Sequence, residues 1–313
     1  MLSFLLRRAV STLPVLLIVA LIVFMMTRLA PGDPAALMVG DSASLSDIEQ
    51  VRARLGLDRP LPQQFFAWSG QVVQGELGKS LFLNQSVATL IGQRIEPTLS
   101  LAAFTIVLTV LIAVPLGVLA AWPHGGLLDR ALMSFSVLGF SIPTFVIGYL
   151  LIWGVALKAE LLPVQGYARL ADGVLPWLTH LALPALALSI VYLALIARVT
   201  RAAVAEALTE DYIRTARAKG ISERQVLLRH ALANAAVPIV TVIGIGVALL
   251  IGGVVVTETV FAIPGLGQLT VDAVLSRDYP LIQGITLFFS VIYVLINLLV
   301  DISYVLLAPR IRY

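Results

Sequence analysis

The chain of 313 residues holds 59% hydrophobic residues but only 12% charged residues, and its mean hydropathy is +0.97. Soluble domains carry about a quarter charged residues, so this composition excludes a soluble domain and indicates a membrane protein. The absence of cysteine excludes disulfides, thiol catalysis and zinc sites built on cysteine. The net charge of +3 is small, so only its distribution along the chain is informative.

Six long intervals contain no Asp, Glu, Lys, Arg or His, and each approaches or exceeds the ~17–25 residues that a spanning helix needs. They predict an all-α, polytopic membrane protein with six transmembrane helices. The first interval follows two arginines as in a signal peptide, but its length and the lack of an A-x-A cleavage site favour a retained helix. The intervals are 9–27, 97–123, 131–157, 181–197, 231–257 and 279–300.

The distribution of Lys and Arg predicts the orientation. Twelve of the 21 basic residues fall before the first interval, after the second, between the fourth and fifth, or at the C-terminus. The other nine fall in the remaining loops, where acidic residues outnumber them. We therefore expect a bacterial inner-membrane protein with both termini and the central segment in the cytoplasm.

The longest segment between predicted spans is 28–96. Residues 1–96 are therefore interpreted as a first transmembrane helix with an extracytoplasmic segment, and residues 97–313 as a five-helix core. Gly78-Lys79-Ser80 looks like the end of a phosphate-binding loop, but such a loop needs glycine where the chain has Val73. No nucleotide site is expected.

The third interval contains a helix breaker near its middle. Pro143 cannot donate a hydrogen bond to the carbonyl of Gly139, so it predicts a kink or an opening of the helix at mid-membrane. Freed backbone there is tolerated only when it is buried in protein or lines a wet cavity. Two interpretations stay open: a kink that serves packing, or a wall of the translocation path with Ser141 and Thr144 as polar contacts.

The polar segment 198–233, which follows the fourth interval and includes the first residues of the fifth, has the pattern of two short helices joined by a tight corner. Thr209 is expected to cap the first helix, with Glu210 and Asp211 in its first turn, where the helix dipole favours negative charge. Gly220 is expected to end this helix in the left-handed conformation.

The second short helix carries its own start signal. Ser222 and Gln225 have the spacing of a capping box, and Ile221 and Val226 that of the accompanying hydrophobic staple. A charged helical hairpin held against the membrane is therefore predicted.

The hairpin also carries a resemblance. Asp211–Gly220 reads DYIRTARAKG, which resembles the cytoplasmic loop of permease subunits in ABC importers, most closely the dipeptide, oligopeptide and nickel branch. The sequence departs from that pattern at Ala233, where the family usually has proline, and at Ala308, where it usually has Asp or Asn. Further matches extend the resemblance to nearly the whole chain: His230–Asn234, Pro238, Pro31–Pro34, Leu55–Leu61, Gly75–Ser80, Pro163–Gly166, Ile263–Gly267 and Arg277–Pro280.

The resemblance implies the type I ABC importer permease fold, in which the short helix before the glycine docks in a groove of an ATPase subunit. Ala216 and Ala218 are expected to allow close docking, and Arg214, Arg217 and Lys219 to meet acidic groups of that subunit. The alternative is a solvated charged loop. The residues that match the coupling motif are Asp211, Tyr212, Thr215, Ala216, Arg217, Ala218, Lys219 and Gly220.

The resemblance also implies partners: a homologous second permease subunit, two ATPase subunits, an extracytoplasmic solute-binding protein and membrane lipid. ATP and Mg²⁺ would bind the ATPase subunits, so no cofactor is expected on this chain. Glu258 and the turn Pro264–Gly267, at the outer end of the fifth interval, are expected to form part of the translocation path, an external gate or a docking surface.

Other function classes find little support. His124, His180 and His230 flank different spans, so neither a metal site nor a nucleophile–base pair is predicted. No basic patch with interleaved aromatic residues indicates nucleic acid. An ion-coupled secondary transporter is the alternative class, but it predicts ionisable residues inside the spans, and the six intervals contain none.

The solute is the least constrained property. The branch that the chain resembles imports dipeptides and oligopeptides, and also glutathione-like peptides, nickel chelates and opines. Its selectivity lies largely in the binding protein, so peptides are the first expectation and the other three solutes are alternatives.

Overall fold

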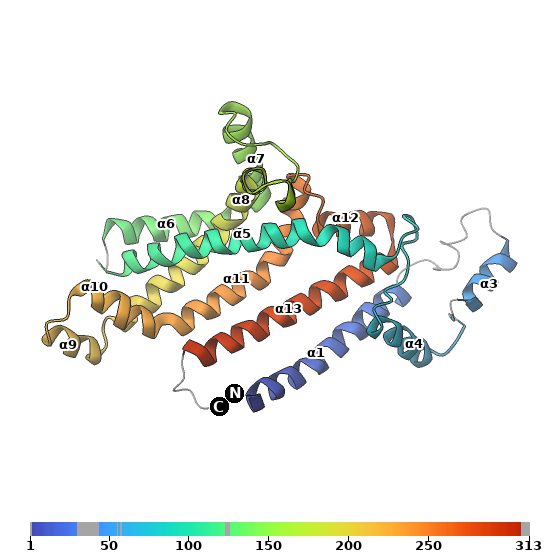
Figure 1. Ribbon diagram of the computed structural model, residues 1–313, viewed down its shortest axis with the longest axis horizontal. Helices are drawn as coiled ribbons and strands as arrows, with labels where there is room; N and C mark the ends of the chain where they lie inside the picture. Colours follow the sequence, from blue (N-terminus) through green and yellow to red (C-terminus); the bar gives the residue numbers. More distant parts are fainter. Residues whose placement is uncertain (1, 30–43, 55, 57, 123–125, 308–313) are drawn as a thin grey trace. The chain divides into compact units, whose positions relative to one another are not determined.

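The computed structural model of the chain describes residues 2–29, 44–54, 56, 58–122 and 126–307. These residues are almost entirely helical (Figure 1), and the only extended pairing among them is an isolated β-bridge between Lys79 and Ser86. The all-α prediction is confirmed. Pro31–Pro34, Leu55, Leu57 and Ala308 lie outside the described residues.

The described helices differ widely in length, from one turn to 35 residues. In chain order they are α1 (Leu2–Leu29), α3 (Leu45–Arg54), α4 (Leu61–Val73), α5 (Val87–Ala121), α6 (Leu127–Ser141), α7 (Thr144–Leu151), the π-helix η1 (Ile152–Lys158), the 3₁₀-helix η2 (Leu170–Asp172), α8 (Val174–Ala207), α9 (Asp211–Ala218), α10 (Glu223–Gln225), the π-helix η3 (Val226–Ala231), α11 (Leu232–Val260), α12 (Leu266–Ser276) and α13 (Tyr279–Leu307).

The predicted count of six spans is not confirmed among the described helices. By length and composition, four described helical stretches can cross a membrane: α5, α8, the run Glu223–Val260, and α13. The pair α6 and α7–η1 adds a fifth if it counts as one span, and Val10–Met26 within α1 is a shorter apolar helix. The described residues of the six uncharged intervals lie mostly in helices, but the count of six is not confirmed.

The third interval is broken where Pro143 predicted a break. α6 ends at Ser141, Ile142 is extended, and α7 begins at Thr144. The two helical segments are bent by 101°, because proline lacks an N–H and disfavours a helical conformation in the residue before it. The predicted kink is confirmed as a complete break.

The chain forms two compact units. The larger contains Arg94–Leu269 and the second half of α13, and the smaller contains Arg7–Gln93 and Thr270–Ile292. In the smaller unit, the ring of Phe24 on α1 packs against Phe65 and Trp68 of α4, with centroids 5.4 and 5.6 Å apart. These contacts hold α4 against the end of α1.

The smaller unit also uses two of the motifs that carry the family resemblance. Asp278 precedes α13, and its carboxylate accepts the backbone N–H of Leu281 at 3.3 Å and the hydroxyl of Ser80 at 2.5 Å. The turn that contains Gly78-Lys79-Ser80 is thereby fixed to the start of α13. Ser80 is buried and serves as a structural donor.

In the larger unit, α8 is the central helix and packs against α11, α6 and α7. Near the α9 end of α8, Arg201 forms a bidentate ion pair with Asp129 of α6, its Nε lying 2.8 Å from Oδ1. The Asp129 side chain is only 6% exposed. Bidentate geometry makes such a pair strong and directional, and it fixes α6 to α8 close to the predicted coupling hairpin.

Candidate functional site: the α9 hairpin and the outer end of α11

The hairpin lies at one end of α8 and α11 (Figure 1). α9 begins two residues after the predicted cap, because Thr209 donates its hydroxyl to the carbonyl of Glu206 at 2.7 Å instead of capping. Glu210 occupies the N-cap position with an extended backbone, and Asp211 is the acidic residue of the first turn. The prediction of Thr209 as the cap is therefore wrong, while the short helix itself is confirmed.

The corner after α9 is a Schellman motif, as the glycine predicted. Gly220 has φ +76°, which a side chain disfavours. Its N–H bonds the carbonyl of Arg217 at 2.9 Å, and the N–H of Ile221 bonds the carbonyl of Ala216 at 3.2 Å. These two bonds satisfy carbonyls that the helix end would leave unpaired.

The second short helix starts at the predicted residue but without the predicted cap. Ser222 stands at the N-cap position, yet its side chain makes no capping hydrogen bond, so the capping box is wrong. The hairpin is closed instead by Arg217, whose Nε and Nη2 lie 2.8 and 3.1 Å from the carboxylate of Glu223.

The inner face of α9 is buried in this chain. Ile213 is fully buried and Ala216 is 6% exposed. Both belong to one apolar cluster with residues of α5, α8, η3 and α11: Val118, Ala121, Val204, Ala207, Val226, Leu227, Ala231, Ala235 and Ile239. Ala216 was expected to face the ATPase, and that orientation is wrong: a small side chain is needed here because α9 lies against its own core.

The outer face of α9, defined here as Tyr212, Thr215, Ala218 and Lys219, is exposed. These residues recur at spacings of three and four, so they lie on one side of the helix. Partial burial, followed by the charge of Glu210, raises the pKa of Tyr212. The outer face therefore offers one aromatic hydroxyl, one hydroxyl, one methyl group and one ammonium.

Two of the three basic residues expected to meet a partner already have acidic neighbours. Arg217 pairs with Glu223, and Arg214 lies 3.2 Å from Asp211 in a highly exposed pair, which is weak in water. Lys219 forms no ion pair with any residue that the structure describes. Of these three basic residues, it is the one most available to a docking protein.

The break between α6 and α7 places the other predicted path residues at the surface of the isolated chain. Ser141 is exposed and donates its hydroxyl to the carbonyl of Val137 at 2.8 Å. Pro143 is exposed and Thr144 is half-buried. Their assignment to the translocation path stays a prediction.

Glu258 has a different environment. Its side chain is fully buried near the end of α11. Oε1 accepts the hydroxyl of Thr98 at 2.6 Å, while Oε2 accepts the N–H groups of Gly267 at 2.7 Å and Gln268 at 3.1 Å. The Thr98 oxygen in turn accepts the N–H of Leu266 at 2.7 Å.

We call this network the Glu258 clasp. It joins α5, α11 and the start of α12, and in this structure its carboxylate contacts protein groups that already satisfy it. Neither Ser141 nor Thr144 is among its partners. Thr98 was missed by sequence reasoning, since a threonine after a proline carries no special signal. The two glycines at 265 and 267, which follow an acidic residue, were the available clue.

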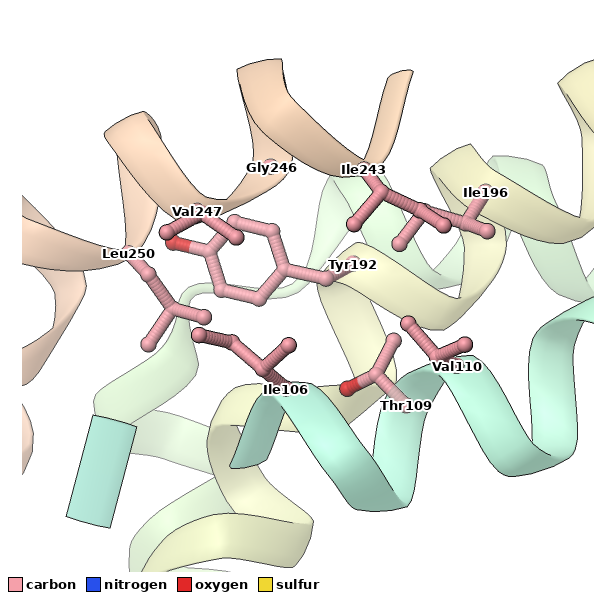
Figure 2. A pocket seen from close by; sticks show the side chains of 9 residues that line it. All are labelled: Ile106, Thr109, Val110, Tyr192, Ile196, Ile243, Gly246, Val247 and Leu250. Carbon is pink, nitrogen blue, oxygen red and sulfur yellow. The ribbon is translucent and has the colours of Figure 1, made fainter. Parts of the chain in front are cut away.

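A small pocket lies between α5, α8 and α11 in the larger unit (Figure 2). The Tyr192 side chain reaches from α8 toward Val247 and Leu250 of α11, and the hydroxyl of Thr109 donates to the carbonyl of Thr105 within α5. The rest of the lining is apolar: Ile106, Val110, Ile196, Ile243, Gly246, Val247 and Leu250. It lacks the charged groups that would hold the ends of a peptide.

Two family descriptions match the chain and together cover nearly all of it. Residues 113–313 match the binding-protein-dependent transport system inner membrane component, and residues 1–102 match the N-terminal region of the same membrane component. The match of 113–313 includes the whole α9 hairpin and Glu258.

Two named relatives are similar to this chain over its full length. A probable peptide ABC transporter permease of Sinorhizobium fredii is 53% identical over 310 residues, which is 99% of each chain. The glutathione transport system permease of Escherichia coli K12 is 43% identical over 318 residues, which is 100% of each chain.

A solved structure, an inward-facing form of the MetNI methionine ABC transporter, aligns with a TM-score of 0.58 at 19% identity. It covers 70% of this chain and 96% of that chain, and it supports the type I importer permease fold. The predicted resemblance and the role of an importer permease are confirmed, and the alternative of an ion-coupled secondary transporter is set aside. The chain belongs to the family of binding-protein-dependent transport system inner membrane components, and it is a multi-pass permease subunit of an ABC importer.

Proposed function

We propose that two ATPase subunits drive this permease, and that one of them docks on the outer face of α9. The observation that carries the proposal is the division of α9 into two faces. Ile213 and Ala216 are buried in the chain's own core, while Tyr212, Thr215, Ala218 and Lys219 are exposed. A helix fixed on one side and open on the other can transmit a push from a partner.

The hairpin is attached firmly enough to pass on that push. The Arg217–Glu223 pair and the Schellman corner link α9 to α10, and the buried cluster links it to α5, α8 and α11. Because packed interiors resist deformation, a displacement of α9 moves the ends of these helices with it. In this proposal, ATP and Mg²⁺ bind the ATPase subunits. This chain contributes α9 and the helices packed against it, which move when the ATPase moves.

The proposed orientation has both termini and α9 in the cytoplasm, where ATPases work. The charge asymmetry of the loops supports it. Residues 1–96 remain our proposed first span with an extracytoplasmic segment, residues 97–313 the core, and 198–233 the coupling loop. The test is a reporter that is active only outside the cytosol, fused after residue 215. A signal from this fusion would contradict the proposed topology.

The assembly we propose contains a homologous second permease, two ATPase subunits and an extracytoplasmic binding protein in the bacterial inner membrane. Peptides are the proposed solute, because the Sinorhizobium relative is named for peptides and the Escherichia coli relative for glutathione, itself a small peptide. Nickel chelates and opines are the other candidates.

Uptake into proteoliposomes tests the function. The complex, reconstituted with its binding protein, is expected to accumulate a labelled dipeptide only when ATP is supplied on the side of α9. Unlabelled dipeptide should compete with the label more strongly than reduced glutathione or a nickel–histidine chelate does. Stronger competition by the chelate would reassign the solute, and uptake without ATP would contradict the ATP-driven mechanism.

A further inference from the structure

The external turn after α11 is shaped around the carboxylate of Glu258. A Cβ atom on Gly265 would overlap that carboxylate, and one on Gly267 would lie 2.8 Å from Oε2 and 2.5 Å from the Cα of Val255. A side chain at Gly265 would therefore displace the Glu258 carboxylate, and one at Gly267 would also displace the backbone of Val255. Separating this buried carboxylate from its three donors is costly, because each released donor would lie unpaired in the interior.

The same turn is held from a second side. The N–H of Gly166 donates to the carbonyl of Phe261 at 2.9 Å, and the side chain of Gln165 donates to the carbonyl of Val260 at 3.3 Å. A Cβ atom on Gly148 of α7 would lie 3.2 Å from the ring of Phe261. The end of α11 is thus a junction between α5, α7, the loop that holds Gln165, and the start of α12.

A continuous helical run joins this junction to the hairpin. Glu223–Val260 comprises 38 residues, which corresponds to roughly 55 Å at about 1.5 Å per residue. Its first residue pairs with Arg217 of α9, and Glu258 lies two residues before its last residue. One rod therefore has the proposed ATPase-docking hairpin at one end and the clasp at the other.

We propose that Glu258 is a positioning residue for transport. The clasp joins α5 at Thr98, the end of α11 and the start of α12 into one rigid body, so a displacement entering at α9 reaches the external turn. Glu258 acts through Thr98 and the backbone of Gly267 and Gln268, not by touching the solute. This inference rests on the proposed coupling through α9.

Thr98→Val tests the clasp because valine keeps the shape of threonine and removes the hydroxyl that both donates to Glu258 and accepts from Leu266. Peptide uptake by the reconstituted complex is expected to fall at least about tenfold, because two buried hydrogen bonds are lost and their partners are left unpaired. Thr98→Ser retains a hydroxyl and is expected to retain uptake. ATPase subunits should co-purify with both variants, since the clasp lies at the other end of α11 from α9.

Opening of the clasp can be measured independently, because the chain has no cysteine. Leu266→Cys places a thiol at a fully buried position, and Ala262→Cys places one at an exposed position of the same turn. A membrane-impermeant maleimide should label the first slowly and the second rapidly. In the Thr98→Val background, labelling at 266 should become faster while labelling at 262 stays the same.

Thr105→Val is the matched control. Thr105 is on the same helix and fully buried, and its hydroxyl has no hydrogen-bond partner among the described residues. Uptake and labelling should equal those of the wild type.

Three results would overturn the inference: wild-type uptake by both Thr98→Val and Glu258→Leu, a loss of uptake without faster labelling at 266, or an equal loss in Thr105→Val. Failure of ATPase subunits to co-purify with the unmodified chain would instead contradict the proposed function.

Discussion

Ala216→Asp is expected to abolish uptake and to remove the ATPase subunits from the purified complex. The side chain is 6% exposed and lies in the cluster that contains Ile213, Val226 and Leu227. Burying a carboxylate there without a partner costs at least about 3 kcal/mol, more than a two-turn helix can offset. α9 should detach from the apolar cluster. Loss of ATPase subunits on co-purification and faster cleavage of the loop in limited proteolysis would both show this.

Ala218→Asp is the matched control, because the same substitution on the same helix falls at an exposed position. α9 should stay seated and resist protease as in the wild type, so any loss of ATPase subunits there would arise from docking alone. Equal protease resistance and wild-type uptake in Ala216→Asp would show that α9 does not need its inner face, contrary to the packing described here.

Gly117→Ala is expected to destabilise the permease core. A Cβ atom at Gly117 would lie 2.6 Å from the carbonyl oxygen of Ala197 and 2.7 Å from the Cβ of Thr200, both on α8. Backbone oxygen cannot move aside as a side chain can, so the two helices must separate. Overpacking of this kind costs about 1–3 kcal/mol, and the midpoint of thermal unfolding in detergent should fall.

Gly92→Ala provides the opposite expectation on the same helix. Nothing lies within 4 Å of a Cβ atom at Gly92, and alanine favours a helix over glycine by about 1 kcal/mol. The thermal midpoint should therefore stay unchanged or rise. A lower midpoint for Gly92→Ala than for Gly117→Ala would contradict the close approach of α5 and α8.

The local signals in the sequence were reliable where a single residue determines the backbone conformation. Pro143 predicted the break between α6 and α7, and Gly220 predicted the left-handed corner, because both residues restrict or free the backbone irrespective of their surroundings. Caps were less reliable. Thr209 and Ser222 fit the capping pattern, but neither side chain caps its helix.

Features that depend on packing could not be read from one sequence. The amino-acid pattern of α9 does not say which face meets the core, so Ala216 was assigned to the wrong side. The partnership of Thr98 with Glu258 joins residues 160 positions apart, and no local signal links them. A count of charges does not show whether a helix is continuous, and the described helices leave the predicted count of six spans unconfirmed.

The central claim is that an ATPase subunit docks on the outer face of α9, and photo-crosslinking from residue 218 tests it most directly. In the cysteine-free chain, Ala218→Cys accepts a single benzophenone maleimide at an exposed position. Irradiation of the assembled complex is expected to give an adduct with an ATPase subunit, whereas the same probe on Ala262→Cys gives none. A transport-competent complex that yields no ATPase adduct from residue 218 would contradict the claim.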